Sequence, residues 1–200
     1  MESTVVREAP RPSPRAVAYS GVLVDPRPLA VATQILVLVS TVVQVVLALT
    51  LGSNPTRFAN AAGIYGIGTI AAVAVFLLWF RRCRRNAEVL APGGHRYPVG
   101  RAVWSWFTPL VMWWAPRRIT LDIWRAGGSV GGAWVIEAWW VAWLANSAGV
   151  VAYSFISHGK GDSPYVAVVH LVGAVLAVLM VRQVTAAQDV MVGAAAATPA

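Results

Sequence analysis

The sequence predicts an all-α integral membrane protein with four transmembrane helices and a cytoplasmic, Trp-rich helical segment between the second and the third. Three observations support this prediction. Charged side chains make up only 12% of the 200 residues, which is about half of what a soluble protein carries. Hydrophobic residues make up 58%, and the mean hydropathy is +0.62. These apolar residues form long stretches, each able to cross about 30 Å of hydrocarbon at roughly 1.5 Å per residue.

The four expected spans follow one another along the chain. They cover residues 29–51, 59–80, 133–157 and 164–184. The turn formers GSNP close the first span, and the fourth begins at Pro164, a favoured residue of a first helical turn. Residues 1–28 are rich in proline and arginine and predict a disordered N-terminus. Residues 185–200 are mostly alanine and other small residues and predict a disordered tail.

The distribution of basic residues predicts the orientation. The two short loops, 52–58 and 158–163, contain one basic residue each, whereas the connection 81–132 contains nine arginines. Because short loops rich in Lys and Arg stay in the cytoplasm, we expect the long connection to lie there. With four spans, both termini are then cytoplasmic, and the chain is a multi-pass protein of the cell (inner or plasma) membrane.

The connection 81–132 is expected to contain two elements. RRCRRNAEVL at 81–90 continues the second span as a basic helical extension, which APGG at 91–94 stops. The segment VGRAVWSWFTPLVMWWAP at 99–116 is apolar and aromatic, but Pro109 breaks it and arginines flank it. Tryptophan favours the headgroup level of a bilayer. We therefore expect an interfacial or re-entrant segment here rather than a further span.

Several runs in this region resemble a known family. They are FLLWFRRCRRNAEVLAP at 76–92, a Trp-Phe-x-Pro motif at 106–109, WWAPRRITLDIWRA at 113–126 and EAWWVAW at 137–143. Over about residues 60–185 the chain resembles the actinobacterial membrane proteins grouped as domain of unknown function 4328. The resemblance implies a multi-span membrane protein and supplies no activity.

Arginine and tryptophan gather in one part of the chain. Nine of the ten tryptophans fall between Trp104 and Trp143, and the net charge of +8 comes mainly from arginines beside apolar segments. Anionic membrane lipids are therefore the expected partner, and nucleic acid is not. The tryptophans are interpreted as interface anchors, or alternatively as a shallow pocket for a lipid tail or an amphipathic ligand. The candidate headgroup contacts are Arg81, Arg82, Arg84, Arg85, Arg117, Arg118, Arg125, Trp106, Trp113 and Trp114.

Polar residues inside the spans form a second group of candidates. Glu137 is expected to form an ion pair with Arg182, because an ionisable group at membrane depth needs a partner. The other intramembrane candidates are Gln34, Gln44, Asn146 and His170. We expect His170 to be buried and hydrogen bonded to Asn146, Ser147 or Tyr153. An alternative function, a small transporter or channel subunit, requires a water path that touches at least three of Gln34, Gln44, Glu137 and His170.

The sequence shows no catalytic constellation. We find no nucleophile beside a base, no metal-binding quartet and no nucleotide loop, and the single cysteine, Cys83, allows no internal disulfide. Glu88, Asp122 and His95 form the one set that could converge, in an enzyme acting on lipid. No catalysis, metal or cofactor is expected. The leading hypothesis is a non-catalytic membrane protein that acts through lipid or membrane-protein contacts of its basic Trp-rich segment, with a homo-oligomer as a further option.

Overall fold

The computed structural model describes residues 21–51, 55–156 and 164–197, and every regular element in these ranges is helical. The long helices are α2 (Arg27–Leu51), α3 (Pro55–Leu90), α6 (Trp134–Ile156) and α7 (Pro164–Ala197). The short ones are α4 (Arg101–Trp104), the 3-10 helix η1 (Val111–Trp113) and α5 (Ala115–Ala126). The predicted all-α class is confirmed for this part of the chain.

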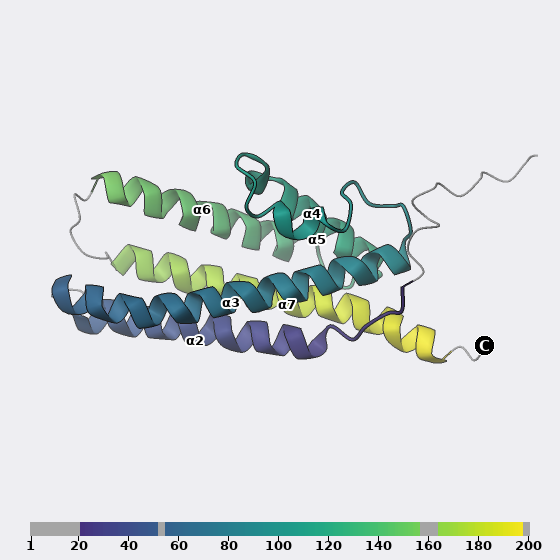
Figure 1. The fold of residues 1–200 in the computed structure, drawn as a ribbon, viewed down its shortest axis with the longest axis horizontal. Helices are drawn as coiled ribbons and strands as arrows, with labels where there is room; N and C mark the ends of the chain where they lie inside the picture. The colour runs from purple at the N-terminus through teal and green to yellow at the C-terminus, as the bar shows by residue number, and fades with distance from the viewer. Residues whose placement is uncertain (1–20, 52–54, 157–163, 198–200) are drawn as a thin grey trace, which may run out of the picture.

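The four long helices lie side by side and alternate in direction (Figure 1). α2 packs against α3 and α7, and α6 packs against α7. The end of α2 and the start of α3 lie at the same end of the bundle as the end of α6 and the start of α7. At the opposite end lie α4, α5 and the C-terminal parts of α3 and α7, which we call the basal end. The arginine-rich connection is therefore gathered at the basal end.

Among the described residues, three helical stretches are long and apolar enough to cross a membrane: Arg27–Leu47, Tyr65–Leu90 and Ala167–Gly193. Their outer faces expose large apolar side chains, including Ile67, Ile70 and Val168, as expected of surfaces that contact lipid. Four such helices were expected, and α6 is not among the three that the described residues contain. The side chains of α6 from residue 150 onward lie outside the described residues, so the described part of this helix is shorter than the other three stretches.

The basic helical extension of the second span is confirmed. α3 continues to Leu90 without a break, and the APGG segment then turns, with Gly93 at a φ of 72°. A left-handed backbone of this kind favours glycine and ends the helix. α7 also continues past its expected end at residue 184. The expected disordered tail is therefore wrong up to Ala197, because Val184, Ala187 and Gln188 are buried against neighbouring elements. Residues 198–200 lie outside the described residues.

Residues 21–26, which we call the strap, are held against the basal part of α3. The side-chain amide of Asn86 makes two hydrogen bonds to the backbone of Val24. Oδ1 accepts from the Val24 N–H at 3.1 Å, and Nδ2 donates to the Val24 carbonyl oxygen at 2.7 Å. Nδ2 also donates to Gln188 Oε1 at 3.1 Å, and Gln188 Nε2 donates to the Cys83 carbonyl at 2.7 Å. The expected disorder of 1–28 is thus wrong from residue 21 onward. Residues 1–20 lie outside the described residues.

The most deeply buried side chains lie toward the basal end. Trp79, Ile119, Ile136 and Met180 come from α3, α5, α6 and α7, and each is at most 1% exposed. Trp79 Nε1 donates to Thr185 Oγ1 at 3.2 Å, which joins α3 to the part of α7 beyond its expected end. Burial and hydrogen bonding together make the basal end a packed unit rather than a set of loops.

Candidate functional site

A basic groove of about 420 Å³ lies between the strap, the start of α2 and the basal part of α3. Its lining combines three arginines with apolar side chains. The lining residues are Gly21, Val22, Val24, Leu29, Leu78, Arg81, Arg82, Arg85, Asn86 and Val89. Arg81 and Arg85 are exposed and lie one helical turn apart, so both guanidinium groups share a face of α3. No acidic side chain is among these lining residues.

The strap positions the third arginine of the groove. Arg82 is partly buried, and its Nη1 donates to the carbonyl oxygen of Asp25 at 3.2 Å. The carboxylate of Asp25 accepts from the backbone N–H of Arg27 at 2.9 Å. Asn86 fixes the strap at Val24, so the width of the groove depends on the Asn86 and Gln188 hydrogen bonds described above. Neither Asn86 nor Gln188 is among the site residues predicted from the sequence.

Arg84 differs from its three neighbours and is a correction to the expected headgroup contacts. It is 1% exposed, its Nη1 lies 2.8 Å from the Glu88 carboxylate, and its Nη2 donates to the Tyr97 carbonyl at 2.6 Å. The periodicity of α3 explains this, because Arg84 lies on the helix face opposite the groove, toward the chain that follows α3. Arg84 holds the connection in place and does not reach the surface.

The segment expected to be interfacial, 99–116, forms α4, a series of turns and η1 instead of one continuous helix. It exposes five large apolar side chains: Trp104, Phe107, Leu110, Trp113 and Trp114. Leu110 has a φ of 65° and a ψ of −52°, and the Val111 N–H donates to the Pro109 carbonyl at 2.8 Å. This is a γ-turn of the rare, strained form. It leaves Leu110 71% exposed at the turn.

α5, which follows the exposed aromatic side chains, carries exposed basic side chains of its own. Arg118 and Arg125 are exposed there, and Arg125 Nη1 lies 3.4 Å from the Asp122 carboxylate. Trp113 and Trp114 are each 42% exposed, and the headgroup contacts expected at these four residues stay a prediction. Basic and aromatic side chains side by side are typical of a membrane interface.

Trp106 departs from this pattern, because its ring packs inward. Its centroid lies 5.4 Å from that of Phe76 on α3 and 5.7 Å from that of Trp143 on α6, both edge to face. The expected headgroup role of Trp106 is therefore corrected. Its indole Nε1 is buried and has no hydrogen-bond partner among the described residues, which is costly for a donor removed from water.

Glu137 pairs with Arg117 of α5. The Arg117 Nε and Nη2 atoms donate to the two carboxylate oxygens at 2.5 Å each, a bidentate geometry. The hydrogen bond that Arg117 donates to Glu137 is the main cause that raises the pKa of Arg117. The expected Glu137–Arg182 pair is wrong. Arg182 is exposed, and the adjacent Gln183 is the α7 side chain that reaches the start of α6, donating to the Gly132 carbonyl at 2.9 Å.

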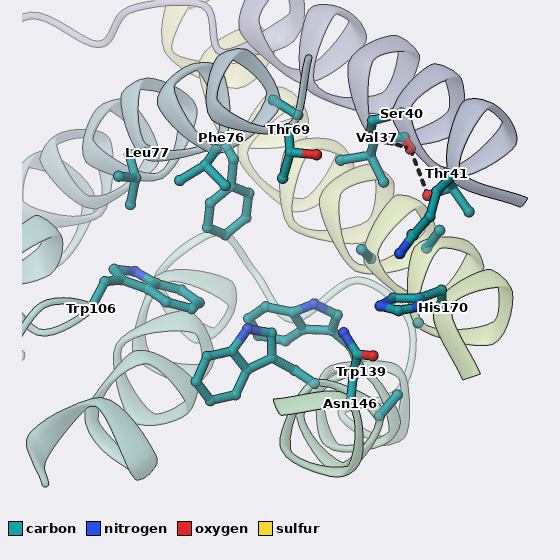
Figure 2. A pocket seen from close by; sticks show the side chains of 18 of the residues that line it. Val37, Ser40, Thr41, Thr69, Phe76, Leu77, Trp106, Trp139, Asn146 and His170 are labelled. Carbon is teal, nitrogen blue, oxygen red and sulfur yellow. Dashed lines mark hydrogen bonds between the residues drawn. The ribbon is translucent and has the colours of Figure 1, made fainter. Parts of the chain in front are cut away.

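A second cavity, which we call the cleft, has a volume of about 410 Å³ and lies between the long helices, open on one side. All four long helices line it, and Trp106 and Phe107 line it from the segment after α4. Figure 2 shows Trp106 toward one end of the cleft, with His170 and Asn146 toward the other. Of the predicted intramembrane residues, the cleft gathers Gln44, Asn146 and His170 and leaves out Gln34. His170 Nδ1 is buried without a hydrogen-bond partner in the described structure, and the side chain of Tyr153 is outside the described residues.

The three residues considered for catalysis, all within the described ranges, each contact a different group and form no hydrogen bond or ion pair with one another. Glu88 pairs with Arg84, Asp122 pairs with Arg125, and His95 Nε2 lies 2.9 Å from the Ala87 carbonyl. Across the described ranges, no three His, Cys, Asp or Glu side chains are grouped so that they could hold a metal ion.

These features define a helical bundle with three helices able to cross a membrane, a basic groove at one end and an apolar cleft between the long helices. The chain belongs to the family described as Domain of unknown function (DUF4328), whose family model matches residues 55–189. The match covers α3 to α7 almost completely. Searches of curated proteins and of solved structures give no significant match.

Proposed function

We propose that this chain is a multi-pass membrane protein that binds an anionic lipid headgroup in the basic groove. The observation that carries the proposal is the composition of the groove: Arg81, Arg82 and Arg85 on one side and Leu29 and Leu78 beside them. Guanidinium groups bind phosphate through paired donors. Adjacent apolar side chains suit the start of an acyl chain. The proposal retains the expected contacts Arg81, Arg82 and Arg85 and leaves out Arg84.

The position of the groove along α3 supports a headgroup site. Arg81 directly follows the apolar part of α3, and Leu78, 53% exposed, lies one turn before it. The basal end would therefore lie at the cytoplasmic surface, with Trp113, Trp114, Arg118 and Arg125 extending the same interface. Because the nine arginines are gathered there, the rule that positive segments remain inside supports this orientation.

We further propose that α6 is a fourth span. Its 23 residues extend about 34 Å at 1.5 Å per residue, which exceeds the thickness of the hydrocarbon region. It packs along α7, which itself contains a stretch able to cross. Four spans place both termini on the basal, cytoplasmic side. The Arg117–Glu137 pair would then neutralise the one carboxylate near the inner end of α6.

The experiment compares lipid binding by the full chain and by charge-matched variants. Native mass spectrometry of the detergent-purified protein would titrate phosphatidylglycerol against phosphatidylcholine with the same acyl chains. The test variant carries Arg81→Gln and Arg85→Gln. The control carries Arg96→Gln and Arg101→Gln, which removes the same charge from exposed residues outside the groove. Each groove arginine is expected to contribute about 1 kcal/mol, so the test variant should lose about 30-fold in affinity for phosphatidylglycerol.

The control should lose little affinity, and phosphatidylcholine binding should be the same in all three proteins. Equal losses of phosphatidylglycerol affinity in both variants would mean that net charge alone causes the effect, and they would contradict specific binding in the groove. The transporter alternative is less well supported, because the cleft touches Gln44 and His170 but neither Gln34 nor Glu137.

A further inference from the structure

The cleft exists because a segment of the connection separates two helices. α3 packs against α2, α5 and α7, while α6 packs against α7 and α5. Trp106 enters between α3 and α6 and contacts aromatic rings on both, with Phe80 at 5.9 Å and Trp139 at 6.2 Å. The walls of the cleft are therefore largely aromatic and aliphatic, and no charged side chain is among its lining residues.

Most hydroxyl groups in the cleft are already bonded. Thr41 Oγ1 and Ser40 Oγ both donate to the Val37 carbonyl, at 2.8 and 3.0 Å, and Thr69 Oγ1 donates to the Tyr65 carbonyl at 3.1 Å. Two lining nitrogens differ, because Trp106 Nε1 and His170 Nδ1 are buried and have no partner within the described part of the chain. An indole N–H can only donate, so the group that satisfies Trp106 must be an acceptor.

The two unpaired nitrogens lie toward opposite ends of the cleft (Figure 2). Trp106 lies at the level of Trp139 and Trp143 on α6, from its ring contacts. Asn146, which lies near His170 in Figure 2, is three to seven residues further along α6. At 1.5 Å per residue this separation is about 5 to 10 Å along the helix axis. A flat ring with an acceptor at each end needs the upper part of this range, because a hydrogen bond of about 2.9 Å is added at both ends of the ring.

We propose that the cleft binds a neutral, flat, apolar ring with carbonyl acceptors at opposite ends, the chemistry of a para-quinone, with His170 in the tautomer that carries its proton on Nδ1 and therefore donates, as Trp106 does. The absence of charge in the lining disfavours an ionised ligand, because an isolated ion in an apolar site is expensive. A volume of about 410 Å³ is within the range of small-molecule sites. Aromatic walls favour a ring that can stack on them. The proposal concerns binding alone, and it uses residues separate from those of the basic groove.

The test measures retention of a short-tailed benzoquinone by the full-length, detergent-purified protein after desalting, with the bound probe quantified by chromatography. Trp106→Phe keeps an aromatic ring and removes the donor, and His170→Phe removes the opposite group. The matched controls are Trp104→Phe and Gln34→Leu, which lie outside the cleft. We expect about one probe per chain, with a five- to tenfold weaker affinity in each cleft variant.

A fatty-acid methyl ester of similar size tests whether binding requires a flat ring, because the ester offers a carbonyl on a flexible chain. We expect it to bind more weakly than the benzoquinone. Equal retention of the two probes, or equal retention by the cleft and control variants, would overturn the proposal and would indicate partition into the micelle. Retention of neither probe would overturn it as well, with water left as the partner of the two nitrogens.

A second measurement does not depend on the variants folding. In protein labelled with ¹⁵N-histidine, benzoquinone should shift the imidazole resonances of His170 and leave those of His95, which lies outside the cleft, unchanged. Unchanged His170 resonances at saturating probe would overturn the proposal. Loss of lipid binding in the groove variants would leave this result unaffected.

Discussion

Removal of the Asn86 side chain should release the strap from α3. Asn86 is 2% exposed and makes two hydrogen bonds to Val24 and one to Gln188. A typical hydrogen bond contributes about 1 kcal/mol, so loss of the two bonds to Val24 should favour local opening of the strap by about 2 kcal/mol. Asn86→Ala is therefore expected to accelerate hydrogen exchange of the Val24 amide about 30-fold.

The third bond should affect the whole protein. Without Asn86, the Gln188 Oε1 atom loses its donor while the Gln188 side chain is 0% exposed. An unpaired buried acceptor costs about 1 to 3 kcal/mol, so the melting temperature should fall as well. Arg85→Ala, one residue earlier and exposed, is the control. Hydrogen exchange followed by mass spectrometry of peptides covering residues 21–30 is the assay. Unchanged exchange at Val24 in Asn86→Ala would refute the assigned hydrogen bonds.

Three further predictions test the basal packing by thermal unfolding in detergent. Glu137→Gln should lower stability by no more than about 1 kcal/mol, because its ion pair is 36 to 39% exposed, and Arg182→Gln should have no effect; equal losses would contradict the assignment of Arg117 as the partner. Gly127→Val should cost about 1 to 3 kcal/mol, because a Cβ there would lie 3.0 Å from the Ala187 backbone; an unchanged melting temperature would be inconsistent with this contact. Truncation after residue 183 should destabilise the protein, whereas truncation after Gly193 should not. If the two truncated proteins had equal melting temperatures, residues 184–193 would not contribute to the packing and the expectation of a disordered tail would hold for them.

Much of the bundle could be predicted from the sequence. Length and composition identify the helices, and the extension of α3 follows from the helical run at 81–90 and its APGG terminator. The tail could not be predicted in the same way, because an alanine-rich segment has no strong apolar face. Thr185 and Gln188 are three residues apart and share a face of α7. Two polar residues on one face were the feature of the sequence from which packing of this segment against a polar surface could have been inferred.

The site residues depended on rotation of the helices, which spacing alone does not determine. Antiparallel register placed Arg182 near the level of Glu137, but it did not show that α5 brings Arg117 closer. The four arginines within residues 81–85 of α3 also looked equivalent, although the helix directs Arg84 inward. For Trp106, the sequence indicated an interface but could not distinguish a ring on the surface from a ring between helices.

Cysteine labelling in intact cells tests the membrane arrangement most directly. In a Cys83→Ala background, single cysteines would replace Thr56, exposed near the start of α3, and Arg118, exposed at the basal end. A membrane-impermeant maleimide should label the Thr56→Cys protein before lysis and the Arg118→Cys protein only after lysis. If Arg118→Cys is labelled in intact cells, the basal end faces outward, and neither the proposed orientation nor a cytoplasmic headgroup site can hold.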